Sequence, residues 1–183
     1  MTATYIQALK PNVTPHEALR TFSGSGLSTL YWKMRSGPLQ RIADAYVPYR
    51  LYRVHYNMGR VPHSTFFAMD AVDGSLDLFT FPQLPAASDL VTIHTQNRIT
   101  PSLQASAAES ALRQKVLRVI FQQGFFKVRD LKLEIAPSPL EMHIPYWLGF
   151  YGRAFLRCRV LNAVRRRMEG AKASALFESW LTA

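Results

Sequence analysis

The chain has one cysteine, Cys158, among its 183 residues. It therefore cannot form a disulfide within itself, and a thiolate metal site would need other ligands. Its five histidines lack the short spacings typical of metal ligands; they are His16, His55, His63, His94 and His143. We therefore expect no metal site.

Long apolar runs are also absent. No stretch approaches the roughly 20 apolar residues that a membrane-spanning helix needs. The opening residues, MTATYIQALKPNV, lack the basic start and apolar centre of a secretory signal. We therefore expect a cytoplasmic protein without a transmembrane segment.

The motifs of the common enzyme classes are missing too. Residues 24–26 (GSG) have neither the Lys-Ser/Thr ending of a P-loop nor the spacing of a dinucleotide-binding motif. Cys158 is expected to be a small buried hydrophobe. Asp70 and Asp73 flank a turn and are expected to shape it. No set of nucleophile, base and orienting group emerges, so we expect no catalytic residues and no cofactor.

Acidic residues are few compared with basic ones. The chain has 22 Lys and Arg against 12 Asp and Glu, a net charge of +10. This excess permits contact with nucleic acid, an anionic membrane surface or an acidic partner, and does not choose among them. Hydrophobic residues make up 48% of the chain, which is enough for a packed core in one domain or two small ones.

Residues 46–81 are the most strongly patterned stretch. Residues 46–56 are dense in Tyr, Val and Leu and predict a strand, as does the apolar run 66–72. Residues 59–64 predict a loop. Asp73-Gly74 predicts a hairpin turn, because a type I′ turn needs positive φ at its central residues. A further strand is expected over 75–81.

Helix and strand signals cover the rest of the chain. Thr14, Pro15 and Glu17 form the pattern of a capping box at a helix start. Further helices are predicted over 105–123, where Gly124 ends the apolar repeat, and over 169–181. Strands are predicted over 90–95, 125–135, 140–151 and 155–164. Residues 27–34 fit a strand or a helix, and a strand is favoured. Residues 136–139 (APSP) predict a turn, and Pro145 indicates an edge strand or a bulge.

The two halves follow a similar plan. Each has a helix, a turn, an x-Pro-Tyr-x-Leu segment and then Asp/Asn-Ala-Val. The matching pairs are residues 35–39 with 136–140, 47–51 with 144–148, and 68–72 with 160–164. We therefore predict an internal duplication within an α+β fold. The first helix-plus-antiparallel-meander unit would span residues 1–85, a linker 86–104, and the second unit, with a C-terminal helix, residues 105–183.

The hairpin of the first half resembles a known module. Strands 52–56 and 66–69, followed by residues 70–76 (DAVDGSL), look like the end of a PepSY-type module. That resemblance implies a small cystatin-like α+β fold and a binding or regulatory role, often restraint of a peptidase. The second half departs from it, since Asn162 replaces the acidic residue and three arginines occupy the turn. Such modules also usually lie outside the cytoplasm.

Three function classes follow from these patterns. The leading hypothesis is a non-enzymatic binding or regulatory protein that uses a sheet face or the groove between the units, with a protein or small ligand as its partner. Its candidate binding residues are Arg50, Tyr52, Tyr146 and Trp147. Exposed sheet edges would also allow homo-oligomerisation. A small-ligand enzyme is the least favoured class.

The alternative hypothesis is nucleic-acid binding. Basic residues cluster near aromatic ones late in the chain, as in surfaces that bind single strands, although the expected alternative is a solvated strand face and a charged hairpin tip. The cluster comprises Arg153, Arg157, Arg159, Arg165, Arg166, Arg167 and Lys172.

This alternative predicts binding to generic DNA or RNA that weakens steeply as salt rises, because bound phosphates release counterions. Changing Arg165, Arg166 and Arg167 together to Ser should abolish it. A salt-titrated binding assay with single- and double-stranded probes is the measurement. Failure to bind at low salt would leave the positive charge without this role.

Overall fold

The computed structural model describes residues 2–24, 26–58, 61–124, 131–152 and 157–182. They form two compact units. Unit 1 is drawn from Met1–Val47, Val91–Ile99 and His143–Ala183, and unit 2 from Pro48–Leu90 and Thr100–Met142. The two expected segments, 1–85 and 105–183, therefore each contribute to both units. The expected linker, 86–104, contributes its central residues to unit 1.

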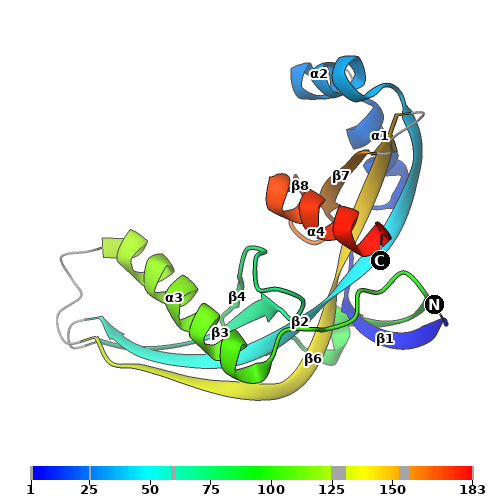
Figure 1. Ribbon diagram of the computed structural model, residues 1–183. Coiled ribbons are helices and arrows are strands. Elements are labelled where there is room, and N and C mark those ends of the chain that lie inside the picture. The colour runs from blue at the N-terminus through cyan, green and yellow to red at the C-terminus, as the bar shows by residue number, and fades with distance from the viewer. Residues whose placement is uncertain (1, 25, 59–60, 125–130, 153–156, 183) are drawn as a thin grey trace. The chain divides into compact units, whose positions relative to one another are not determined.

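Helices and a mixed sheet confirm the α+β class (Figure 1). The hydrogen-bonded strand order is β4-β3-β2-β6-β1-β5, with β7 paired to β6 and β8 to β7. Strand β1 runs parallel to β6, whereas the β2–β3, β3–β4, β6–β7 and β7–β8 pairs are antiparallel. The strands are β1 Thr4–Leu9, β2 Leu39–Met58, β3 Val61–Asp70, β4 Phe79–Phe81, β5 Leu90–Thr95, β6 Leu133–Tyr151, β7 Arg157–Asn162 and β8 Arg167–Met168.

The helices are α1 Pro15–Ser23, α2 Leu27–Ser36, α3 Ala105–Gly124 and α4 Ala171–Thr182, with a 3₁₀ turn, η1, at Ala87–Asp89. In the described part of the chain, no helix combines the length and apolar character needed to cross a membrane.

The long strand β6 continues through three prolines, so the turn predicted over residues 136–139 is wrong. Proline has no N–H to donate, but its φ suits an extended chain and its carbonyl still accepts. The Pro145 carbonyl accepts from the Ala163 amide at 3.1 Å, and the Pro48 carbonyl of β2 accepts from Ala71 at 2.8 Å. Pro145 lies within a strand paired to β1 and β7 rather than at a sheet edge.

In unit 2, α3 covers one face of the sheet (Figure 1). The predicted four-residue repeat is confirmed, because Ala108, Leu112, Val116 and Ile120 are all buried. They pack on alternate residues of β2 and β3: Tyr52, Val54, Tyr56, Phe67 and Met69. Burial of these side chains supplies the main driving force for this unit.

The turn after β3 is organised by the buried carboxylate of Asp70. Its Oδ1 accepts from the amides of Val72, Asp73 and Gly74 at 3.3, 3.1 and 2.8 Å. Its Oδ2 accepts from the Leu76 amide at 3.0 Å. Gly74 has φ +70°, but Asp73 does not have positive φ, so the predicted type I′ turn at Asp73-Gly74 is wrong. The turn is longer than a two-residue hairpin, so β4 begins at Phe79 and not at residue 75.

Unit 1 ends its own hairpin in a related way. Asn162 Oδ1 accepts from the Val164 and Arg165 amides at 3.1 and 3.0 Å. Asn162 lies opposite Tyr146, as Asp70 lies opposite Tyr49 in unit 2. Each tyrosine follows a proline whose carbonyl accepts from the residue after the Asp or Asn. The two hairpins therefore share a register and a side-chain-capped turn.

The start of α1 confirms the capping box. The Glu17 amide donates to Thr14 Oγ1 at 3.3 Å, and the Thr14 amide donates to Glu17 Oε2 at 2.8 Å. Later in α1, Phe22 is fully buried. A Cβ at position 149 would lie 2.7 Å from the Phe22 ring, so only glycine lets the helix pack so close to β6.

Helix α2 replaces the strand predicted over residues 27–34, so that prediction is wrong. Leu27, Leu30, Tyr31 and Met34 recur at the three- and four-residue spacing of a helix, not at the alternation of a strand. Strand β1 was not predicted at all. The apolar residues Ile6, Ala8 and Leu9 are too few to give a periodic signal outside their tertiary setting.

We predict that Asp70→Ala lowers the free energy of unfolding by roughly 3 kcal/mol, because buried amides lose their acceptor. Urea denaturation measures the change. Asp73→Ala is the matched control, since Asp73 is exposed and its Oδ1 accepts from the Ser75 amide at 2.8 Å. Equal effects of the two substitutions would contradict the central role of Asp70.

Candidate ligand-binding pocket in unit 1

A pocket of about 440 Å³ lies in unit 1 between α2, β7, β8 and α4. Its wall combines aromatic, apolar and charged side chains. The lining residues are Trp32, Arg159, Met168, Glu169, Gly170, Ala171, Ser174, Ala175 and Glu178. Its volume lies within the range of small-ligand sites, and its lining mixes apolar surface with charged groups.

Arg159 is the central charged residue of this pocket. It is only 7% exposed, and its guanidinium carbon lies 5.6 Å from the centre of the Trp32 ring. Behind it, the Tyr151 hydroxyl donates to the Phe22 carbonyl at 2.7 Å. Burial raises the pKa of Tyr151, and the positive charge of Arg159 works against that rise. The Arg159 guanidinium is thus held by the ring of Trp32 and the hydroxyl of Tyr151.

Two carboxylates also line the pocket. Glu169 Oε1 accepts from Asn162 Nδ2 at 2.9 Å, and its Oε2 lies 3.6 Å from an Arg167 guanidinium nitrogen. Glu178 Oε1 accepts from the Cys158 amide at 3.3 Å. These contacts tie the carboxylates to the β7–β8 hairpin, so the pocket wall is anchored by the same turn that Asn162 caps.

Cys158 lies directly behind this wall and is buried, as the sequence predicted. Burial, and secondarily the charge of Glu178, raise the pKa of the thiol to about 12. The group is therefore protonated at neutral pH, which suits a packing role and not that of a nucleophile.

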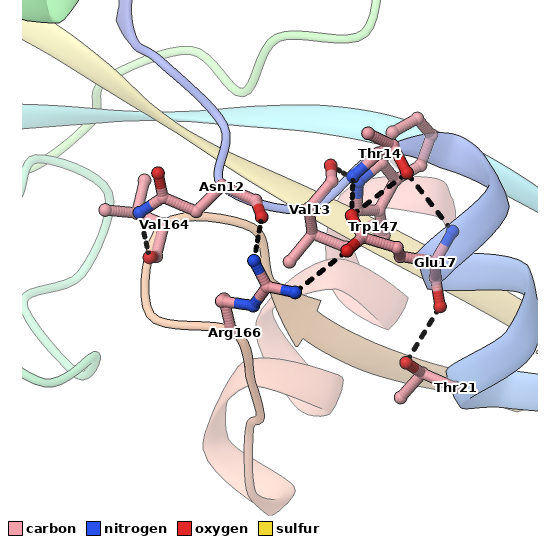
Figure 2. A network of polar contacts seen from close by, with 8 residues as sticks. All are labelled: Asn12, Val13, Thr14, Glu17, Thr21, Trp147, Val164 and Arg166. Carbon is pink, nitrogen blue, oxygen red and sulfur yellow. Dashed lines mark hydrogen bonds and ion pairs between the residues drawn. The ribbon is translucent and has the colours of Figure 1, made fainter.

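A polar network in the same unit fixes the segment before α1 onto the β7–β8 turn (Figure 2). Arg166 donates to the Asn12 carbonyl and to Glu17 Oε1, both at 2.8 Å. Trp147 Nε1 donates to the Val13 carbonyl at 3.0 Å (Figure 2). The pKa of Glu17 is lowered, mainly by the Thr14 amide and hydroxyl and further by Arg166. Arg166 has φ +56°, so the turn places its side chain toward α1.

The four residues predicted to bind a ligand lie in different units. In unit 2, Arg50 donates to the Leu103 carbonyl at 2.8 Å, and Tyr52 is buried against α3. In unit 1, Tyr146 packs edge-on against Phe177, and Trp147 belongs to the network just described. Each has a packing or hydrogen-bonding contact within its unit, and none lines the pocket. Their role in ligand binding stays a prediction.

The predicted basic surface is divided by the structure. Arg159 is buried in the pocket wall, because α2 and α4 cover that face of β7. Arg157, Arg166, Arg167 and Lys172 are exposed and Arg165 is half-buried. Arg153 lies outside the described residues.

Nucleic-acid binding stays a prediction, and the contacts of the arginines change which residues should be substituted to test it. Changing Arg165–Arg167 would also remove the contacts of Arg166 with Asn12 and Glu17. Arg157 and Lys172 are the better positions for the variant.

Sequence reasoning missed most of the pocket. Trp32 is far in the chain from Glu169, Ser174 and Glu178, and no motif joins it to them. In a strand, Trp32 would share a face with Met34. In the helix that the structure shows, Trp32 lies on the side opposite Leu27 and Met34. Among the residues with described positions, no group of three or more His, Cys, Asp or Glu could hold a metal ion.

Comparison with known proteins adds no relative: no family model matches the sequence, and no curated protein or solved structure matches the chain. The resemblance to PepSY-type modules therefore stays a prediction.

Proposed function

We propose that this chain is a non-enzymatic binding protein whose pocket in unit 1 holds a ligand with a carboxylate next to an apolar or aromatic group. One observation carries the proposal: Arg159, a residue only 7% exposed, places its guanidinium over an aromatic ring in the wall of a 440 Å³ pocket.

The guanidinium supports a carboxylate ligand on chemical grounds. It has five N–H donors in a planar fork that matches the two oxygens of a carboxylate. It can therefore bind a ligand while keeping its contacts with Trp32 and Tyr151. Such a charge-assisted hydrogen bond is shorter and stronger than one between neutral groups.

The rest of the wall supports an apolar neighbour for that carboxylate. Trp32, Met168, Ala171 and Ala175 offer aromatic and aliphatic surface. Glu169 and Glu178 accept hydrogen bonds from Asn162 and from the Cys158 amide, and they disfavour a second negative charge on the ligand. The favoured ligand is thus a monoanion, either a small organic acid or the free carboxyl terminus of a peptide.

The experiment compares acids with their neutral amides. We expect isothermal titration calorimetry to detect binding of aromatic or branched aliphatic monocarboxylates, and no binding of the matched amides. Arg159→Met should weaken binding at least about tenfold, because one partner of a buried charge pair is lost. Arg157→Met, two residues away and exposed, is the control. Acids and amides that bind equally well, or full affinity in Arg159→Met, would overturn the proposal.

A second arm identifies the source of the carboxylate. Peptides with a free carboxyl terminus are compared with the same peptides amidated at that end. Binding of free acids alone assigns a small-molecule ligand, whereas tighter binding of the free-terminus peptides assigns a protein partner.

We also infer that the chain contains an internal duplication in which each unit combines segments from both sequence repeats. The equivalent registers of Tyr49–Asp70 and Tyr146–Asn162 support it, as do the two capped turns. Unit 1 contains α1, α2 and the first part of β2, together with the second part of β6, β7 and α4. Unit 2 has the reverse combination: α3 and the first part of β6, with the second part of β2 and β3. A helix over an antiparallel hairpin in unit 2 is consistent with the cystatin-like expectation.

The duplication predicts a pattern in homologous sequences. Both halves should retain Pro-Tyr and the Asp/Asn-Ala-Val that follows it, because both motifs build the same turn. Aligning homologues at positions 48–49 and 145–146 with 70–72 and 162–164 tests this. Free variation of the motif in one half, with retention in the other, would contradict the duplication.

A further inference from the structure

Helix α2 presents an apolar stripe to solvent. Leu27 is 87% exposed, Leu30 50%, Tyr31 57% and Met34 82%. Their spacing of three and four residues places them on one side of the helix. Leu19 of the preceding helix α1 is also exposed, at 43%. We call these five residues the α1–α2 stripe.

The stripe holds an unusual share of the exposed apolar side chains. In the part of the chain that the structure describes, ten large hydrophobic residues are exposed, and five of them lie between positions 19 and 34. Isolated exposed apolar residues need no explanation, but a contiguous set marks an interaction surface. The other side of α2 is already used, since Trp32 lines the pocket.

The segment that carries the stripe is basic between Glu17 and Asp44. From residue 18 to residue 43 the sequence contains Arg20, Lys33, Arg35 and Arg41 and no Asp or Glu. Arg20, Arg35 and Arg41 are exposed. Arg35 also donates to the Tyr31 hydroxyl at 3.1 Å, which places a guanidinium at the edge of the stripe.

We propose that the α1–α2 stripe docks on an anionic phospholipid surface. Short amphipathic helices with apolar residues on one side and Lys or Arg near the edges lie in the membrane interface in this way. The apolar side chains would enter the acyl boundary while the arginines contact headgroup phosphates. Docking of a second copy through the same stripe is disfavoured, because it would bring two segments of equal positive charge together.

The test is co-sedimentation of the full chain with vesicles. One set contains phosphatidylcholine with phosphatidylserine, and the other contains phosphatidylcholine alone. We expect binding to the anionic vesicles that weakens as salt rises, and little binding to the neutral ones. Leu27→Gln combined with Met34→Gln should reduce binding about tenfold or more, because both side chains lose their place in the acyl boundary. Gln is a good helix former, so α2 is retained, and circular dichroism verifies this.

The matched control is Val61→Gln with Leu181→Gln, two apolar residues that are 57% and 46% exposed elsewhere on the chain. This control should bind like the unchanged protein. Three results would overturn the proposal: equal binding to both vesicle types, no vesicle binding, or unchanged binding by the Leu27/Met34 variant. Self-association that this variant abolishes, without vesicle binding, would assign the stripe to a second copy instead.

Discussion

The hydrogen bonds from backbone amides to Asp70 and to Asn162 are the constraint on which each unit depends. A buried amide without an acceptor is costly, so the chain can reverse after β3 and after β7 only where a side chain supplies the missing oxygen. In each case the turn also fixes the strand register, because Asp70 and Asn162 lie opposite the tyrosines of the two Pro-Tyr segments. A slip of one residue would place buried side chains in solvent.

In unit 1 the same turn leads to the candidate site. Asn162 donates to Glu169, and Glu169 begins the pocket wall that continues into α4. Arg166, in the same turn, holds the segment before α1. The β7–β8 hairpin therefore supports both the pocket and the entry to the first helix. Arginines that look from the sequence like one basic surface have three different surroundings: a pocket wall for Arg159, a local network for Arg166 and solvent for Arg157.

Helix α2 connects the two proposed interactions. One side carries Trp32 into the pocket, and the other carries Leu27 and Met34 into solvent. A helix of ten residues gains little stability by itself in water, so its contacts on the Trp32 side are needed to hold it. Leu27 and Met34 on the other side are largely exposed, so substitutions there can test binding without disturbing the fold.

The sequence by itself determined the local features of this protein. The capping box at Thr14, the apolar repeat of α3, the positive φ of Gly74 and the burial of Cys158 were all predictable, because each depends on residues close in sequence or on general burial preferences. Tertiary structure alone decided the passage of β6 through its prolines and the formation of the pocket around Arg159. Both depend on partners outside the local segment, such as Ala163 for Pro145 and Trp32 for Arg159, and a single sequence carries no periodic signal for such pairs.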